Sequence, residues 1–198
     1  MFVSFEGLDG SGKTTQAVLA RSFLAEQGRE TVSTREPGGT PLGEAVREIL
    51  LDGAEMTPWA EAALFAAARA ELVAEVIRPA LDRGADVLSD RYLDSSLAYQ
   101  GIARGLGVDA LLHLNWQGIG GLLPDRTFLL LVDPEESMRR GEDEPDRIER
   151  EGLAFRVLVD DAYRRLADLY PERIVPIDGA LRPVDVARII HGHLRDLS

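Results

Sequence analysis

The most informative segment of this chain is Gly7-Leu8-Asp9-Gly10-Ser11-Gly12-Lys13-Thr14. It matches the pattern Gly-x-x-x-x-Gly-Lys-[Ser/Thr], in which a glycine-rich turn points backbone N–H groups at phosphate oxygens. The octet follows an apolar run, Phe2–Glu6, and opens a helical one, Thr14–Gln27, which is the context that the pattern requires. We expect all eight residues to bind a nucleoside triphosphate, with Lys13 spanning the outer phosphates and Thr14 supplying a hydroxyl to Mg²⁺.

Lys13 is the only lysine of the chain, and the other 21 of its 22 basic side chains are arginine. A compact ammonium bridges adjacent phosphates as a point charge, whereas a guanidinium is a wide, rigid fork. The chain therefore keeps its one lysine where this chemistry needs it. A compositional bias that spared one lysine by chance is the alternative interpretation.

Composition limits the class of protein. The 198 residues, 45% of them hydrophobic, suffice for one globular domain over residues 1–198. No apolar run reaches the roughly 18–20 residues that span a bilayer, and the first residues lack signal-peptide features, so we expect a cytoplasmic protein without a membrane partner. The absence of cysteine excludes disulfides and thiolate metal sites. A net charge of −12 argues against a nucleic acid polymer as partner, but a cleft rich in arginine can still bind a small anion.

Short apolar runs alternate with helical ones along the chain. Strands are predicted at Phe2–Glu6, Glu30–Thr34, Ala85–Ser89, Thr127–Val132 and Arg173–Ile177. Helices are predicted over Thr14–Gln27, Thr57 to about Arg83 with a kink or break at Pro79, about Asp109–Gln117, Glu135–Arg139, Leu153–Leu169 and Pro183–Leu194. This alternation predicts an α/β fold with a five-stranded parallel sheet flanked by helices and ligands at the C-terminal ends of the strands.

Charged residues follow two of these strands, as that rule requires. Arg35 follows the second strand within a Pro-Gly-Gly loop, and Asp90 and Arg91 follow the third. An aspartate in the position of Asp90 can hold Mg²⁺ or its water shell, and Arg91 would then face the same cleft. A capping or surface ion pair is the alternative for each of them.

Two further segments have two possible interpretations. Phe65 and Arg69 share one helix face, so they could seat a nucleobase, although Phe65 also suits a simple core position. Residues 139–152 contain four arginines, six acids, Pro145 and two glycines. Such a run is either a solvated face or a lid whose arginines neutralise charge on a transferred group.

From about Phe2 to Arg195 the chain resembles thymidylate kinases of the bacterial type. The resemblance rests on residues 6–15 and 34–40, Leu64–Arg69, Asp146-Arg147-Ile148-Glu149 and, most diagnostically, Asp90-Arg91-Tyr92-Leu93-Asp94-Ser95-Ser96-Leu97-Ala98-Tyr99-Gln100-Gly101. It implies a P-loop NTPase fold like that of nucleoside monophosphate kinases. It also implies transfer of the γ-phosphoryl group of ATP to dTMP with Mg²⁺, in a homodimer built largely by helices between Thr57 and Gln117.

The resemblance assigns roles at the acceptor. Arg91 would bind the acceptor phosphate, with Arg35 as a weaker candidate. Phe65 would stack on thymine, Arg69 would hydrogen-bond its carbonyl group, and Pro37 would pack against the base.

The sugar and the lid receive residues in the same way. Asp9 would face the deoxyribose, and Tyr99 and Ser96 would crowd its 2′ side, with Gln100 in the same substrate-binding set. Because the phosphate loop has no arginine, the lid would supply the catalytic one, for which Arg147 is the first choice, followed by Arg150 and Arg140.

Two other functions remain open at this point. A kinase of the same fold could act on another deoxynucleotide or on a deoxynucleoside, although a nucleoside has no phosphate for Arg91 to bind. A nucleotide-dependent switch protein would hydrolyse its nucleotide slowly and without any response to dTMP.

Overall fold

A five-stranded parallel sheet with strand order β2-β3-β1-β4-β5 forms the centre of the molecule. The structure, a computed structural model, describes residues 1–141 and 145–197. The strands are β1 (Phe2–Glu6), β2 (Thr31–Arg35), β3 (Asp86–Asp90), β4 (Arg126–Leu131) and β5 (Ile174–Asp178). The predicted fold class is confirmed, and every predicted strand end lies within one residue of the observed one.

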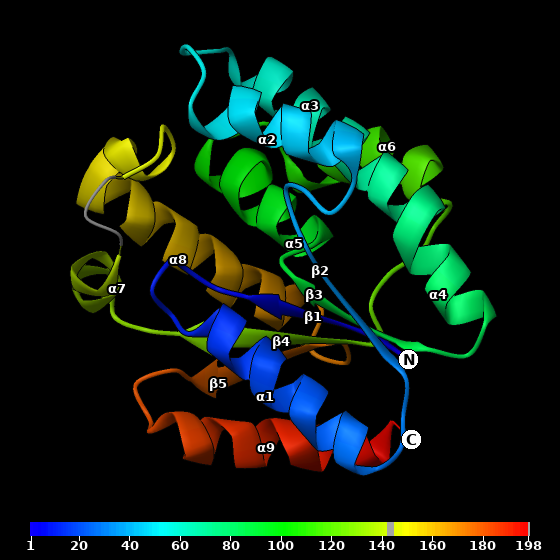
Figure 1. Cartoon of the computed structure of the whole chain (residues 1–198). Coiled ribbons are helices and arrows are strands. Elements are labelled where there is room, and N and C mark those ends of the chain that lie inside the picture. Colours follow the sequence, from blue (N-terminus) through cyan, green and yellow to red (C-terminus); the bar gives the residue numbers. More distant parts are fainter. Residues whose placement is uncertain (142–144, 198) are drawn as a thin grey trace.

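Helices cover both faces of the sheet, which explains why its strands are apolar through most of their length. Every residue of β1 is buried. Its Val3 and Phe5 side chains pack with α1 (Lys13–Glu26) and α9 (Pro183–Asp196), whereas the other face packs with α8 (Gly152–Leu169). Figure 1 shows α1 and α9 below the sheet and α8 above it.

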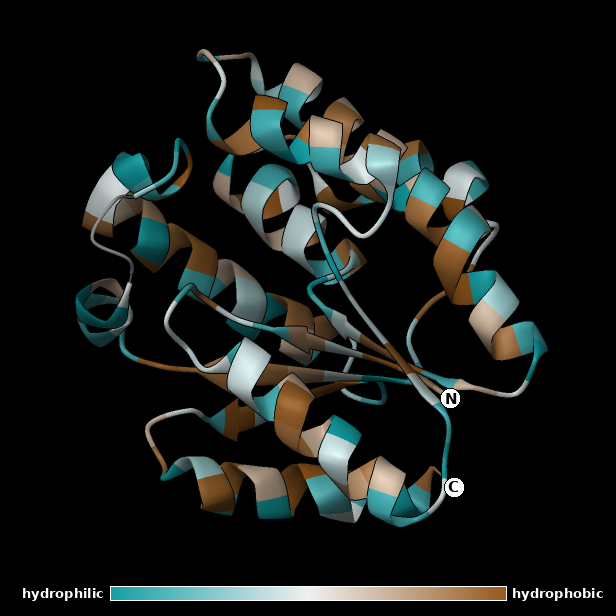
Figure 2. Cartoon of the chain, in the orientation of Figure 1, coloured by the Kyte–Doolittle hydropathy of each residue, from teal (hydrophilic) through white to brown (hydrophobic). Residues whose placement is uncertain are grey.

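The remaining α-helices are α2 (Pro41–Leu51), α3 (Pro58–Leu72), α4 (Arg78–Asp82), α5 (Leu93–Ser96), α6 (Val108–Ile119) and α7 (Pro134–Arg140). Of these, α2, α3 and α6 lie at the top of Figure 1 and α7 lies at the left, next to α8. Most of the helices carry both hydrophobic and hydrophilic residues, which gives them an apolar side to bury (Figure 2). The helices predicted over residues 14–27, 109–117, 135–139, 153–169 and 183–194 are confirmed to within two residues at each end.

The long helix predicted from Thr57 adapts to Pro79 without ending there. Between α3 and α4 the chain forms a π-helical segment, Val73–Ile77, which ends two residues before Pro79. Proline cannot donate the usual hydrogen bond, and its ring crowds the carbonyl group one turn earlier, so a wider turn relieves the conflict. The prediction of a disturbance at this proline is confirmed in that form.

Two helical segments near the predicted site were missed. The first is α2, which begins after Thr40, whose side chain accepts a hydrogen bond from the Gly43 backbone nitrogen at 2.9 Å. A threonine cap followed by proline is an ordinary helix start, but the preceding Pro-Gly-Gly is typical of a loop and conceals it. The second is α5, which continues as a π-helical segment, Leu97–Ala103.

The lid predicted over residues 139–152 lies partly outside the described residues, since 142–144 are not among them. Its described part contains the end of α7 and a short 3₁₀ turn, Glu149–Glu151, before α8. In the described parts of the chain, no helix is both long and apolar enough to cross a membrane.

Candidate active site

Three neighbouring strands bring the predicted site residues to one edge of the sheet. Asp90 at the end of β3 is in register with Arg35 at the end of β2 and with Phe5 in β1. The phosphate-loop sequence that follows β1 therefore begins beside Asp90 and Arg91. This is the C-terminal edge of a parallel sheet, where the alternation of strands and helices predicted the ligands to bind.

Two glycines let the phosphate-loop sequence approach the rest of the molecule closely. The backbone has a positive φ of 136° at Gly7 and 79° at Gly10, a region in which side chains are strained. A Cβ atom at Gly7 would clash with the carbonyl oxygen of Leu130, and one at Gly10 would lie 2.6 Å from that of Ser137. Glycine is therefore required at both positions for the loop to pack against β4 and α7.

The ammonium group of Lys13 is held inside the loop, and the residue is only 6% exposed. Its Nζ donates to the carbonyl oxygen of Leu8 at 2.8 Å and lies 3.4 Å from Oδ1 of Asp9. Burial and the charge of Arg91 lower the pKa of Lys13, whereas the charges of Asp9 and Asp90 raise it. The only lysine of the chain thus lies where a phosphate would meet the loop.

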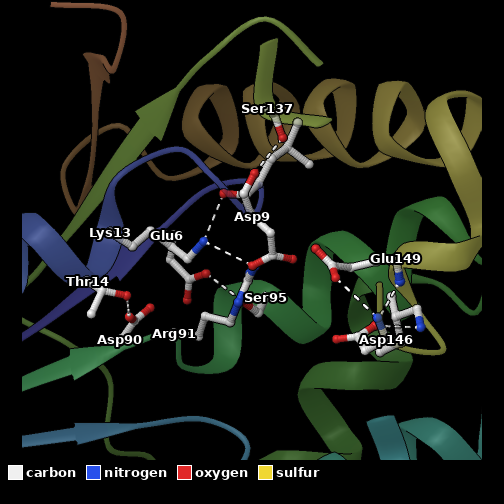
Figure 3. Close-up of polar contacts among 12 residues, drawn as sticks. Glu6, Asp9, Lys13, Thr14, Asp90, Arg91, Ser95, Ser137, Asp146 and Glu149 are labelled. Atoms are coloured by element: carbon white, nitrogen blue, oxygen red, sulfur yellow. Dashed lines mark hydrogen bonds and ion pairs between the residues drawn. The ribbon is translucent and has the colours of Figure 1, made fainter. Parts of the chain in front are cut away.

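Asp9 links the loop to the residue after β3. Its Oδ1 accepts a hydrogen bond from Nη2 of Arg91 at 2.7 Å. Burial alone would raise the pKa of Asp9, but the charges of Arg91 and Lys13 lower it well below its ordinary value. Figure 3 shows its carboxylate between these two cations. Asp9 is therefore ionised, and it joins the loop to the arginine expected at the acceptor.

Thr14 and Asp90 lie together at the side of the loop. Oγ1 of Thr14 donates to Oδ2 of Asp90 at 2.6 Å, although 76 positions separate the two residues (Figure 3). A hydroxyl and a carboxylate are both hard oxygen ligands of the kind that Mg²⁺ prefers. The donor set predicted for the metal is therefore brought together, and its chemistry fits that ion.

A cavity of about 800 Å³ opens over the loop. Among the described residues, its lining includes Lys13 and five arginines, which are Arg35, Arg47, Arg91, Arg140 and Arg150. Six acidic side chains also line it, so the formal charges balance, in contrast to the −12 of the whole chain. A cavity of this volume can hold a nucleotide, and its charge balance lowers the repulsion that an anion would meet elsewhere on the chain.

A smaller cavity of about 100 Å³ shares Asp9 and Arg91 with the larger one. Seven of the nine residues predicted to bind the acceptor line it: Asp9, Pro37, Phe65, Arg91, Ser96, Tyr99 and Gln100. Nη2 of Arg91 lies 3.4 Å from the hydroxyl of Tyr99 and its guanidinium carbon 5.3 Å from the ring centre. Burial raises the pKa of Tyr99 to about 12, which keeps this hydroxyl neutral.

The other two predicted acceptor residues, Arg35 and Arg69, have protein partners. Arg69 is 1% exposed, with Nη2 2.6 Å from Oε2 of Glu36 and Nη1 2.6 Å from Oδ1 of Asn115. Its guanidinium does not line the smaller cavity, although its partner Glu36 does. Arg35 lies at the larger cavity and is paired with Glu44 at 2.9 Å. Their contacts with a substrate stay predictions.

The three candidate lid arginines occupy different surroundings. Arg140 and Arg150 line the larger cavity, and a Cβ atom at Gly10 would lie only 2.9 Å from Cβ of Arg140. Arg147 instead points away, because its side chain is 2% exposed and its Nη2 pairs with Oε2 of Glu61 at 2.6 Å. The charge of Arg147 is neutralised by Glu61 outside both cavities, and which of the three arginines is catalytic stays a prediction.

Arg47 is a site residue that the sequence reasoning missed. It lines both cavities from α2, and its Nη1 donates to the carbonyl oxygen of Pro37 at 3.0 Å. Leu51 and Ile148 also line the smaller cavity and were not predicted. The threonine cap that starts α2 was the signal that could have located Arg47, since a helix there turns this residue toward the loop after β2.

The known proteins that are similar to this chain belong to one family. The model of the family described as thymidylate kinase matches residues 5–190. Two thymidylate kinases are similar over nearly their whole length. The one from Bifidobacterium longum (strain DJO10A) is 47% identical, over 100% of this chain and 98% of its own. The one from Chlorobaculum tepidum is 44% identical, over 96% of this chain and 94% of its own.

A solved structure agrees with these sequence matches. The crystal structure of thymidylate kinase from Ehrlichia chaffeensis superposes with a TM-score of 0.82 at 34% identity, covering 98% of each chain. The loop, the two joined cavities and the arginine after β3 are thus found in a chain whose full length matches one family. This protein belongs to the thymidylate kinase family.

Proposed function

We propose that this chain transfers the γ-phosphoryl group of ATP to dTMP, giving dTDP and ADP. Membership of the thymidylate kinase family carries most of the proposal. The structural observation that supports it best is the pair of adjoining cavities that share Asp9 and Arg91. The larger one contains the phosphate-loop lysine and suits the donor triphosphate, and the smaller one suits the acceptor.

The chemistry needs positioning and charge neutralisation more than a side-chain nucleophile. Backbone N–H groups of the loop and Lys13 would hold the outer donor phosphates. Arg91 would neutralise the acceptor phosphate, so that its oxygen can approach the γ-phosphorus. The fixed position of these cations would stabilise charge as it develops, without reorganisation during the reaction. No dedicated general base is part of the proposal.

The walls of the smaller cavity support thymidylate as the acceptor. Phe65 would stack on the base, with Pro37 packing beside it. Tyr99 and Ser96 would crowd the 2′ side of the sugar, which favours deoxyribose. Arg69 lies behind this wall, so we propose that it supports the base-binding surface and reaches the thymine carbonyl group only if its own contacts rearrange.

We also propose Mg²⁺ as the metal of this site. Thr14 and Asp90 would hold it, directly or through its water shell, because both present oxygen atoms at the side of the loop. When bound, the ion neutralises charge on the outer phosphates of the donor. The hydroxyl and carboxylate are already directed at one another, so little side-chain movement is needed to accept it.

For the lid, we propose that Arg140, together with Arg150, supplies the positive charge over the transferred group. Arg140 is favoured because it ends α7 directly beside Gly10 of the loop. Its guanidinium has only the partly exposed Glu136 as an ion-pair partner among the described residues, and such surface pairs are weak. It can therefore turn toward a triphosphate at little cost.

We propose a cytoplasmic homodimer as the working form. The cytoplasmic location is consistent with the nucleotide substrates. For the dimer, α3 and α6 pack against each other and carry exposed tryptophans, Trp59 at 51% and Trp116 at 45%. Large exposed aromatic side chains are enriched at protein interfaces. Sedimentation velocity of the wild type and of Trp116→Glu would test this, because a dimer through this face should dissociate in the variant.

A coupled assay of ADP release across dTMP, dUMP, dCMP, dGMP and AMP tests the proposed reaction. dTMP should be the best acceptor and AMP should fail, and strong activity with AMP would rule out the thymine-binding interpretation. Arg91→Ala separates the alternatives. It should remove most dTMP turnover and leave ATP binding nearly intact, whereas a deoxynucleoside kinase or a switch protein would be insensitive to it.

A further inference from the structure

The guanidinium of Arg91 is held from behind by two hydroxyl groups. Its Nη1 donates to Oγ of Ser95 at 3.0 Å and to Oη of Tyr163 at 3.1 Å. Both hydroxyls donate in turn to Oε2 of Glu6, Ser95 at 2.6 Å and Tyr163 at 2.8 Å. Figure 3 shows Glu6, Arg91 and Ser95 together beside the loop. A chain of hydrogen bonds thus runs from the guanidinium through two hydroxyls to one carboxylate.

The direction of these hydrogen bonds follows from the number of protons. Each hydroxyl has a single proton and can donate only once. The oxygens of Ser95 and Tyr163 are 2.9 Å apart, but each lies closer to Glu6 than to the other. When Glu6 is ionised, both protons are therefore directed at it, and the lone pairs of both oxygens are left to accept from Arg91. The carboxylate fixes the orientation of the two acceptors.

Burying the Glu6 side chain in this position costs free energy. The residue is 0% exposed, and burial together with the charge of Asp94 raises its pKa to about 7, although the charge of Arg91 lowers it. Burying a carboxylate costs free energy unless hydrogen bonds compensate it. Its contacts are the two hydroxyls and the backbone N–H of Tyr92, at 2.8 Å. An apolar residue would suit this core position better if no orienting role were needed.

The backbone conformation of Arg91 is a second reason why its guanidinium has to be held in place. Within residues 1–141 and 145–197, it is the only non-glycine residue with a positive φ, 70°. A side chain in this left-handed region is strained and has to be held by its surroundings. Its two terminal nitrogens have different partners, since Nη1 donates to the two hydroxyls and Nη2 donates to Asp9. Arg91 and Asp9 are lining residues of both cavities.

We propose that Glu6, Ser95 and Tyr163 are positioning residues that hold Nη1 of Arg91, so that its Nη2 edge faces the acceptor phosphate. The inference rests on the proposed role of Arg91 at that phosphate. The three residues come from β1, α5 and α8, so elements from both ends of the chain define one guanidinium orientation. Tyr163 makes α8, the helix that follows the lid segment, part of the acceptor site.

The test uses Tyr163→Phe in the full chain, with Tyr92→Phe as a matched control. Both tyrosines are buried and both variants lose one hydrogen-bonded hydroxyl, but that of Tyr92 donates to the carbonyl oxygen of Leu122 at 3.0 Å, away from Arg91. Calorimetric titration would measure the dissociation constants of dTMP and of thymidine, which has no phosphate. Arg91→Ala, measured alongside, establishes whether Arg91 recognises the phosphate at all.

Tyr163→Phe should weaken dTMP binding about tenfold, the size expected when a charged group loses one hydrogen bond. Thymidine binding should change less than about twofold in both tyrosine variants, by the same reasoning that only the phosphate is affected. Ser95→Ala and Glu6→Gln should shift the same ratio of dTMP to thymidine affinity, and they provide the answer if Tyr163→Phe does not fold.

The outcomes separate the two levels of the inference. If Arg91→Ala keeps the preference for dTMP over thymidine, the role of Arg91 itself is wrong. If Arg91→Ala loses the preference but Tyr163→Phe keeps it, Arg91 binds the phosphate without help and the positioning inference is wrong. An equal loss of affinity for dTMP and thymidine in Tyr163→Phe would indicate a general distortion and would also overturn it.

Discussion

Nη2 of Arg147 lies 2.6 Å from Oε2 of Glu61, and neither side chain is more than 2% exposed. Glu61 also accepts from Nε of Arg104 at 2.7 Å and from Nε2 of Gln100 at 2.8 Å. Burial alone would raise the pKa of Glu61, but the hydrogen bonds from Arg104, Gln100 and Arg147 lower it. One carboxylate on α3 therefore holds the lid sequence and, through Gln100, a wall of the smaller cavity.

Arg147→Ala should lower the free energy of unfolding strongly and should have a smaller effect on kcat. Removing one member of a buried ion pair costs roughly 3–5 kcal/mol, and the remaining contacts of Glu61 with Arg104 place the expected loss near the low end, at about 3 kcal/mol. Urea unfolding would measure it. Arg139→Ala is the control, because that lid arginine is 73% exposed and should change little. If Arg147→Ala leaves the free energy of unfolding unchanged but lowers kcat strongly, Arg147 is the catalytic arginine after all.

Arg140→Ala should show the opposite behaviour. The guanidinium lies at the larger cavity and is 39% exposed, so its removal should leave the unfolding free energy nearly unchanged. If it neutralises charge on the transferred group, kcat should fall about a hundredfold or more. Steady-state kinetics with saturating dTMP would measure the fall. A kcat within about twofold of the wild type would exclude Arg140 as the catalytic arginine.

Lys13→Arg tests why the only lysine lies in the loop. Positive charge is kept, but a planar guanidinium has to fit where the residue is 6% exposed and hydrogen-bonded to Leu8. We expect kcat to fall roughly a hundredfold or more, with ATP binding also weakened. Stopped-flow ATP binding and the coupled assay would measure both effects. Wild-type kinetics in this variant would show that charge alone, not shape, matters at this position.

Glu6 should make stability depend on pH. Its folded-state pKa of about 7 lies above the ordinary 4.5, so the fold favours the neutral acid. The stability from this preference is fully present below about pH 4.5 and is lost as the pH rises through 7. Against Glu6→Gln, which does not titrate, the wild type should lose up to about 3 kcal/mol between these limits. Parallel pH curves from urea unfolding of the two proteins would contradict this.

Local sequence signals predicted the sheet and the loop because they act over short distances. An apolar run buried on both faces indicates a parallel strand, as in β1, and the pattern Gly7–Thr14 specifies a turn through its glycines. The same local signals failed at α2, where the prediction stopped at Pro-Gly-Gly and did not follow the cap at Thr40. With α2 missing, Arg47 could not be placed in the site.

Sequence patterns alone predicted the fold class and the phosphate-loop motif, and seven of the nine residues predicted for the acceptor line the smaller cavity. The partner of each charged side chain depends on the tertiary structure. Arg147 pairs with Glu61 across 86 positions and Arg91 meets Tyr163 across 72. A side chain's spacing along its own helix limits where it can point, but its partner depends on how distant elements pack. The free energy of a buried charge depends on that partner, so it cannot be read from the motif alone.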